Sequence, residues 1–355
     1  MITVVVVDDS AFMRKAISTM LEKDSGIKVV ATARDGEEGL EKIRKFNPDV
    51  VTLDIEMPRM DGLTALRHIM MEMPRPVLMV SSLTTEGAEA TLKAMDLGAV
   101  DFIPKQLSKV SLDIVKIEFD LITKVKTVAR RKMRPVPKLR SSLAAHRNVE
   151  SRSAAKAVKP RVGRPKRDVV VIGVSTGGPP AVQKILSAFP ADFPAGIVIA
   201  QHMPKAFTGP FAKRLDGVSK ISVKEAETGD RLSPGHAFVA PGGSHLILNQ
   251  KMSRVDLCVT PDPADALYKP SANVLVTSVA EAMGRRALGV ILTGMGNDGR
   301  DGIKVLKSKG GRAIAQSDST CVVYGMPKAI VDDGLADEIV DIDDMADAIM
   351  NNLYL

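Results

Sequence analysis

The feature that most constrains the fold of this chain is an alternation of short β-branched runs with helix-length amphipathic stretches. In the N-terminal part, the strand-like runs lie at residues 2–7, 28–33, 49–53, 76–80 and 100–103. The amphipathic stretches lie at residues 11–22, 36–45, 62–71, 86–97 and 108–129. Apolar strands separated by helices are typical of a parallel sheet covered on both faces. The pattern therefore predicts a doubly wound α/β domain of five βα units.

A second series of the same kind begins at residue 168. Its strand-like runs lie at residues 168–174, 196–200, 221–225, 287–293 and 311–315. Its expected helices lie near residues 179–189, 271–283, 302–309 and 343–352. Three further short runs, at 236–240, 244–249 and 255–259, favour additional strands and an inserted β-hairpin. The sequence thus predicts a second doubly wound, Rossmann-like α/β domain with a hairpin insertion.

The basic charge of the chain is concentrated between these two series. The whole chain of 355 residues has a formal net charge of +7, yet residues 124–167 contain 16 Lys and Arg and one acid, a local charge of +15. The other residues together therefore carry −8. From residue 133 onward this segment has scattered prolines and no aromatic residue, which is typical of a chain that buries too little apolar surface to fold. We expect a flexible basic linker at 126–167 between domains at 1–125 and 168–355.

Composition limits the classes of protein to which the chain can belong. A basic linker can serve as a nucleic-acid arm or a tether to an acidic surface, but it lacks aromatic residues for base stacking, so we favour a solvated spacer. Cys258 and Cys321 form neither a disulfide framework nor a CxxC metal pair, which fits a reducing cytosol. No apolar run approaches the ~18 residues of a membrane span, and the N-terminus has no basic leader. We therefore expect a cytoplasmic monomer without membrane insertion.

Polar residues stand at the carboxyl ends of the strands in the first domain, where function collects in a doubly wound sheet. Asp8 and Asp9 follow the first strand, and Asp54, Ser81 and Lys105 follow the third, fourth and fifth. Converging carboxylates repel each other unless a cation is present, and an all-oxygen ligand set suits Mg²⁺. Such aspartates can also merely cap the following helices. The full set of five favours a site in which Asp54 accepts a phosphoryl group.

Residues 1–125 resemble the receiver domain of two-component response regulators. The motifs VVDDS, LDIEMPRMDGL, MVSS and DFIPK carry the resemblance. It implies a flavodoxin-like (βα)5 fold and phosphotransfer from a histidine kinase to Asp54. The site roles it implies are Mg²⁺ binding by Asp8, Asp9, Asp54 and the backbone of Glu56, and phosphoryl contact or switching by Ser81, Lys105 and Phe102. Receivers usually have Pro after this lysine, whereas here Pro104 precedes it, so the cis peptide common there is not assumed.

The second domain opens with a glycine-rich turn around a serine. Gly173, Ser175 and Gly177 match the G-x-S-x-G pattern, in which a sharp turn lifts a serine hydroxyl off a strand end. A turn of this kind can equally cradle a phosphate or a dinucleotide, or be only a tight turn. His202 ends the next strand, and Asp298 lies in a glycine-dense loop after a later strand. These three residues would meet at one edge of one sheet, as a Ser-His-Asp site requires.

A different triad, Ser175, Asp230 and His245, would follow the order of α/β-hydrolases. That fold places several strands before its nucleophile, whereas Ser175 follows the first strand of its domain. We therefore favour Ser175, His202 and Asp298.

The region 168–355 closely resembles the catalytic domain of the chemotaxis protein-glutamate methylesterase family. The motifs GVSTGGP, QHMP, YKPSANVL and LTGMGNDGRDG carry this resemblance, which with the receiver and linker spans nearly the whole chain. It implies hydrolysis of glutamate γ-methyl esters on methylated chemoreceptors, often with deamidation of receptor glutamines, and no cofactor in the catalytic site. We expect the backbone N–H of His202 or Met295 to meet the oxyanion, and Thr176 to support the site or its turn.

Two other function classes fit the sequence poorly. A DNA-binding response regulator would need a helix-turn-helix output domain, whereas this output region is rich in strands. A nucleotide-dependent oxidoreductase would need G-x-G-x-x-G and an acid about 20 residues later, and the turn at 173–178 has neither.

Overall fold

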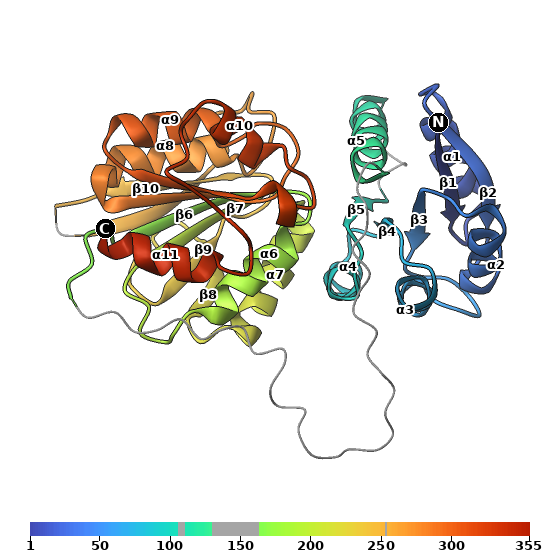
Figure 1. Ribbon diagram of the computed structural model, residues 1–355, viewed down its shortest axis with the longest axis horizontal. Helices are drawn as coiled ribbons and strands as arrows, with labels where there is room; N and C mark the ends of the chain where they lie inside the picture. Colours follow the sequence, from blue (N-terminus) through green and yellow to red (C-terminus); the bar gives the residue numbers. More distant parts are fainter. Residues whose placement is uncertain (106–110, 130–162, 253) are drawn as a thin grey trace, which may run out of the picture. The chain divides into compact units, whose positions relative to one another are not determined.

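The computed structural model describes residues 1–105, 111–129, 163–252 and 254–355, with the backbone alone at 111–116. The chain forms two compact units, residues 1–145 and 146–355. Each unit contains its own sheet and its own core (Figure 1). No helix in the described ranges is both long and apolar enough to cross a membrane.

The first unit has a five-stranded parallel sheet in the order β2-β1-β3-β4-β5. Its strands are β1 (Ile2–Val7), β2 (Ile27–Ala33), β3 (Val50–Asp54), β4 (Val77–Ser81) and β5 (Asp101–Pro104). Its helices are α1 (Ala11–Glu22), α2 (Gly36–Phe46), α3 (Gly62–Glu72), α4 (Thr85–Asp96) and α5 (Ser111–Ala129). Helices α1 and α5 cover one face, and α2, α3 and α4 cover the other (Figure 1). The predicted order of five βα units is confirmed.

The second unit has a seven-stranded parallel sheet in the order β14-β13-β12-β6-β7-β9-β8. Its strands are β6 (Val169–Val174), β7 (Gly196–Gln201), β8 (Ser222–Glu225), β9 (His236–Val239), β12 (Ala287–Ile291), β13 (Arg312–Gln316) and β14 (Glu338–Val340). Its α-helices are α6 (Gly178–Ala188), α7 (Lys205–Val218), α8 (Ala272–Met283), α9 (Arg300–Ser308), α10 (Met326–Asp332) and α11 (Met345–Tyr354). Helices α8, α9 and α10 cover one face, and α6, α7 and α11 the other (Figure 1).

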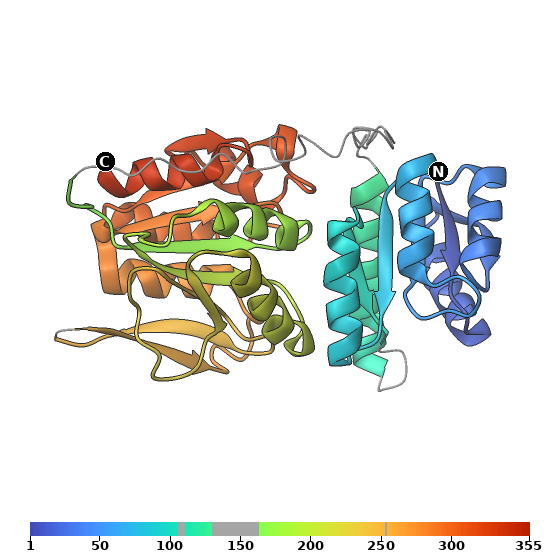
Figure 2. The same cartoon turned by 90° about the horizontal axis from the view of Figure 1, so that it is seen from below.

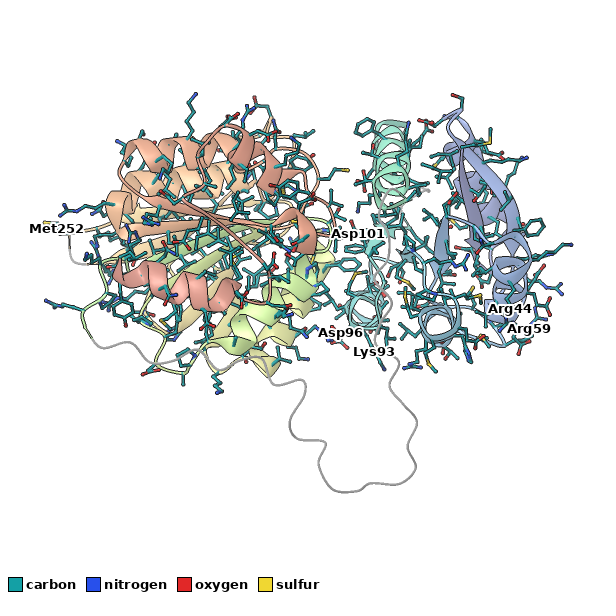
Figure 3. All side chains as sticks on the ribbon, in the orientation of Figure 1. Arg44, Arg59, Lys93, Asp96, Asp101 and Met252 are labelled. Atoms are coloured by element: carbon teal, nitrogen blue, oxygen red, sulfur yellow. The ribbon has the colours of Figure 1, made fainter. Side chains whose placement is uncertain are left out.

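The predicted hairpin is present as a separate two-stranded antiparallel sheet. It consists of β10 (His245–Gln250) and β11 (Val255–Thr260), and it stands beside the parallel sheet in Figure 2. Met252, at the turn, is fully exposed and projects away from the unit (Figure 3). The first of the three short runs, β9, joins the parallel sheet between β7 and β8.

The ordered units extend into the predicted linker at both of its ends. Helix α5 continues to Ala129, and Lys126 within it pairs with Asp24 at 2.8 Å. At the other end, the backbone N–H groups of Lys166 and Arg167 donate to the carbonyl of Leu353 at 2.8 and 3.1 Å, and Arg167 is buried. Both ends of the predicted linker, 126–167, therefore belong to the folded units. Its central part, 130–162, lies outside the described residues.

Candidate functional site

The acidic residues predicted for the first unit meet at the carboxyl edge of its sheet. Asp8 and Asp54 are buried and Asp9 is exposed, and a carboxylate oxygen of each lies within 4.8 Å of the others. The ammonium group of Lys105 lies 2.7 Å from Asp54 Oδ2 and 3.2 Å from Asp8 Oδ2. The structure therefore brings together four of the residues predicted for this site.

A glycine makes the backbone around Asp54 possible. Any Cβ at Gly62 would lie 1.9 Å from the carbonyl oxygen of Asp54, so the turn that starts α3 can pass this close only with glycine. The N–H of Glu56 donates to Asp54 Oδ1 at a long 3.4 Å. Asp54 is thus positioned by its backbone, while its carboxylate has one long backbone hydrogen bond and the contact with Lys105.

The environment of this site disfavours the ionised form of its two buried carboxyl groups, those of Asp8 and Asp54. Burial raises the pKa of Asp54 to about 6, and the charge of Asp8 adds to the shift, although Lys105 opposes it. Burial likewise raises the pKa of Asp8. The Oδ2 atoms of both aspartates are buried without a hydrogen-bond partner in the described residues, apart from the nearby ammonium group. An all-oxygen cluster with unmet demand for positive charge fits Mg²⁺.

The two predicted switch residues, Ser81 and Phe102, are both buried in strands of the first unit. Ser81 is buried at the end of β4, and its hydroxyl contacts the Gly87 carbonyl at 3.1 Å and receives the Thr91 hydroxyl at 2.7 Å. It is therefore engaged with helix α4, and contact with a phosphoryl oxygen would require its rotation. Phe102 is buried in β5, where the Lys124 ammonium group lies 5.6 Å from the centre of its ring.

In the second unit, three adjacent strands bring the predicted catalytic residues to one edge. The sheet order places β6 between β12 and β7, and the last register pair of β6 and β7 is Val174 with Gln201. Ser175 and His202 are therefore the next residues along two neighbouring strands. On the other side, the Ser175 N–H donates to the Thr293 carbonyl at 3.0 Å. Ser175 is held between the other two strand ends.

The side chains of His202 and Asp298 are joined directly. His202 Nε2 lies 2.7 Å from Asp298 Oδ2, and both side chains are nearly buried. Because the carboxylate is the acceptor, Nε2 carries the hydrogen and Nδ1 is left with the basic lone pair. Nδ1 has no hydrogen-bond partner among the described residues. The imidazole also stacks on Tyr268, with ring centroids 4.2 Å apart and planes inclined by 12°.

Asp298 sits at the N-terminus of helix α8, where five donors surround its carboxylate. They are His202 Nε2, the hydroxyl of Ser271, and the backbone N–H groups of Ala272, Asn273 and Gly299. Ser271 is also the N-cap of α8, since its hydroxyl accepts the N–H of Val274. Burial opposes ionisation of Asp298, but the contact with His202 and the backbone donors outweigh it, and its pKa is lowered.

The glycine-dense loop after β12 passes directly over the serine. A Cβ at Gly294 would lie 2.8 Å from Ser175 Cβ, so this close approach requires glycine. Asn273 holds the later part of the loop, because its side-chain carbonyl accepts the N–H groups of Gly299 and Gly302, both at 2.9 Å. The loop therefore fixes Asp298 from one side and covers Ser175 from the other.

One predicted oxyanion donor is ruled out. The His202 N–H donates to the Val174 carbonyl at 3.0 Å, because it makes the last hydrogen bond of the β6–β7 ladder. Met295 directly follows Gly294 and stays a predicted donor. Thr176 is buried and its carbonyl accepts the Thr293 hydroxyl at 2.9 Å, which places Thr176 in the support of the turn.

The rejected triad is not assembled. Both ring nitrogens of His245 are engaged by backbone groups, with Ser271 N at Nδ1 and Pro263 O at Nε2, each at 3.2 Å. The carboxylate of Asp230 contacts Lys224 at 3.0 Å.

Sequence reasoning missed several residues of this site. Tyr268, Ser271 and Asn273 belong to the motif YKPSANVL, which carries a family resemblance but shows no chemical pattern for these residues. The one physical signal there is a serine just before a helix, which is typical of an N-cap. Gln201 lies next to His202 and gave no separate signal.

Comparisons with known proteins show which family the chain belongs to. The family model described as "CheB methylesterase" matches residues 170–349, and "Response regulator receiver domain" matches residues 4–115. A protein-glutamate methylesterase/protein-glutamine glutaminase 2 of Nitratidesulfovibrio vulgaris is 74% identical over 366 residues, with 100% of both chains covered. The protein-glutamate methylesterase/protein-glutamine glutaminase of Pyrococcus horikoshii is 45% identical over 349 residues, covering 98% of this chain and 93% of that protein.

A solved structure supports the same assignment for the second unit. The crystal structure of the Thermotoga maritima CheB methylesterase catalytic domain matches with a TM-score of 0.51 and 38% identity, over 52% of this chain and 98% of that one. The family models together span both units. The chain therefore belongs to the CheB family of protein-glutamate methylesterases, enzymes in which a receiver domain accompanies the catalytic domain.

Proposed function

We propose that this chain hydrolyses glutamate γ-methyl esters on methylated chemoreceptors, releases methanol, and also deamidates receptor glutamines. The observation that carries the mechanism is the His202 Nε2 to Asp298 Oδ2 contact of 2.7 Å, together with the unpartnered Nδ1. This arrangement leaves Nδ1 as the base for Ser175, the next residue on the neighbouring strand. The names of the relatives support the ester and amide substrates.

In the first half of the reaction, Ser175 Oγ attacks the ester carbonyl while His202 Nδ1 takes its proton. Asp298 stabilises the imidazolium that forms. The tetrahedral intermediate then collapses, the C–O bond to the methoxy group breaks, and His202 gives its proton to the leaving methanol. We propose the Met295 N–H as an oxyanion donor, because the loop it belongs to packs against Ser175. The product is an acyl-enzyme on Ser175.

In the second half, a water molecule replaces methanol. His202 Nδ1 removes a proton from the water as its oxygen attacks the acyl carbonyl, and the bond to Ser175 Oγ breaks. The proton returns to Ser175, and the receptor glutamate leaves as a free carboxylic acid. A glutamine substrate follows the same steps with ammonia as the leaving group. The catalytic site needs no cofactor for this chemistry.

The first unit is a receiver domain, and we propose that it regulates the esterase through phosphorylation of Asp54 by a histidine kinase. Asp8, Asp9, Asp54 and the backbone of Glu56 would hold Mg²⁺, which supplies positive charge for the phosphoryl oxygens when bound. The Lys105 ammonium group, 2.7 Å from Asp54 Oδ2, would contact the same oxygens. These roles suit a cytoplasmic protein of the chemotaxis pathway.

The test is methanol release from methylated receptor membranes, with and without a small-molecule phosphodonor and Mg²⁺. Ser175→Ala should lower turnover by at least about 10³-fold, because nucleophile and base act as a unit. Asp54→Asn should keep the basal rate and lose the response to the phosphodonor. Near wild-type turnover in Ser175→Ala would remove Ser175 from the mechanism.

A further inference from the structure

Gln201, the last residue of β7, reaches across the sheet edge between the proposed nucleophile and its base. Its side chain is buried, with 2% of the residue exposed. The amide nitrogen Nε2 lies 3.0 Å from the Ser175 carbonyl oxygen and 3.1 Å from the His202 carbonyl oxygen. One side-chain amide therefore donates to the backbone of both residues.

The position of this amide follows from where the backbone ladder ends. The last ladder bond between the strands runs from the His202 N–H to the Val174 carbonyl. Beyond this bond the two segments turn away from each other into α6 and α7, and the ladder no longer fixes their separation. Carbonyl oxygens only accept hydrogen bonds, so the amide must present its nitrogen to both of them. The Gln201 amide therefore adds one more hydrogen-bonded connection between the two segments after the ladder has ended.

This arrangement has a cost that packing does not explain. Gln201 Oε1 is buried without a hydrogen-bond partner in the described residues. An unsatisfied buried acceptor costs about 1–3 kcal/mol, and such a group calls for a compensating role. A leucine or methionine of similar volume would fill the space without this penalty.

A glycine of the neighbouring motif makes room for the amide. A Cβ at Gly178, the first residue of α6, would lie 2.1 Å from Gln201 Oε1 and 2.6 Å from Val174 Cγ2. The third glycine of GVSTGGP and the glutamine of QHMP are therefore fitted to each other. Both motifs contribute to one contact behind the serine and histidine.

We propose that Gln201 is a positioning residue, which acts by holding the backbones of Ser175 and His202 at the separation that proton transfer requires. This inference rests on the proposed roles of Ser175 and His202. The Gln201 amide bonds to the backbone carbonyls of Ser175 and His202 and would act through the positions of these residues. Its loss should therefore slow the chemical step and leave receptor binding unchanged.

The test compares Gln201→Met with the wild-type full-length protein, activated by phosphodonor and Mg²⁺. We expect kcat for methanol release to fall about 10- to 100-fold, as small misplacements of catalytic groups do, with KM unchanged. Modification of Ser175 by phenylmethanesulfonyl fluoride should slow by a similar factor, because it uses the same nucleophile and base without the receptor. The matched control is Gln183→Met, which removes the bond from Arg214 Nε to Gln183 at 3.0 Å and should change neither rate.

Gln201→Glu is the second variant, since it keeps the shape of the side chain and removes both donors. It carries the test where Gln201→Met fails to fold, and it should lose kcat at least as strongly. The inference is overturned by a folded Gln201 variant with kcat within about twofold of wild type. It is equally overturned by a change confined to melting temperature or KM. Ser175→Ala, assayed in parallel, separates the two proposals: if that variant stays active, the proposed mechanism itself fails.

Discussion

Each of the two units has a buried functional aspartate at the carboxyl edge of a parallel sheet, Asp54 in the first and Asp298 in the second, and the pKa values of the two shift in opposite directions. Burial raises the pKa of Asp54 to about 6, whereas the pKa of Asp298 is lowered. Asp298 receives five donors, including the N-terminus of α8, and these outweigh its burial. Asp54 has one long bond from Glu56, the ammonium group of Lys105, and a second buried carboxylate beside it.

The difference between the two sites follows from when each charge is needed. A triad aspartate must be an anion throughout the catalytic cycle, so its donors are all supplied by the fold. For Asp54, the proposed phosphoryl acceptor, a bound Mg²⁺ would supply the positive charge, and the fold itself supplies fewer donors. The carboxyl edges of the two sheets thus hold one aspartate whose donors come from the fold, Asp298, and one that has fewer donors, Asp54.

The largest expected effect is the loss of esterase activity when the carboxylate of Asp298 is removed. In Asp298→Asn the amide can no longer fix Nε2–H or balance the imidazolium, and we expect about a 10³- to 10⁴-fold loss of kcat for methanol release. Asp301→Asn is the control from the same loop, because its carboxylate is exposed and contacts only Arg300 in the described residues. A comparable loss in both variants would contradict a specific role for Asp298.

The next effect concerns the stability of the receiver domain, which the substitution of Asp54 is expected to raise. The folded pKa of Asp54, about 6, lies above the ordinary value of 3.8, so the folded state binds more protons between these values and loses stability as pH rises through them. At pH 7.5 without Mg²⁺, Asp54→Asn should stabilise the receiver domain by up to about 3 kcal/mol. Chemical denaturation at pH 4 and pH 7.5 measures this.

The same denaturation experiment has two further expected results, one at pH 4 and one with Mg²⁺. The stabilising effect of Asp54→Asn should shrink at pH 4, where the wild-type carboxyl is already protonated, and Mg²⁺ should stabilise the wild-type receiver more than the variant. A destabilised Asp54→Asn at pH 7.5 would show that the carboxylate is well satisfied in the metal-free fold.

A smaller effect is expected from trimming the donors of Asp298 one at a time. Ser271→Ala removes one donor and the N-cap of α8, which should cost about 1 kcal/mol of stability and less than about tenfold in kcat. The matched control is Thr84→Ala, which removes the N-cap of α4 in the receiver. It should lower stability by a similar amount without changing the basal, unphosphorylated esterase rate.

The sheets and their functional edges could be predicted because fully buried parallel strands appear in the sequence as continuous β-branched runs. Helix α7 was missed because Gly209, Pro210 and Gly217 lower its helical propensity, and packing of Phe207 and Phe211 compensates for this. Strand β14 was missed because it is only three residues long.

The meeting of Ser175, His202 and Asp298 at one sheet edge was predictable from the order of the strands, but the contacts between their side chains were not. Which imidazole nitrogen meets Asp298 depends on a side-chain rotamer that no local pattern encodes. The same holds for the Tyr268 stack and the Gln201 amide, which depend on how distant segments pack. The sequence also could not show that the His202 N–H bonds to the Val174 carbonyl, because it does not reveal where the β6–β7 hydrogen-bond ladder ends.

The most direct test of the contrast between the two carboxylates is a carbon-13 NMR titration of the aspartate carboxyl groups in Mg²⁺-free protein, with Asp54→Asn and Asp298→Asn spectra for assignment. The account predicts that the Asp54 resonance titrates with a midpoint of about 6 and that Asp298 stays ionised to below 3.8. An Asp298 carboxyl that is still protonated at about pH 5, or an Asp54 that is fully ionised there, would contradict it.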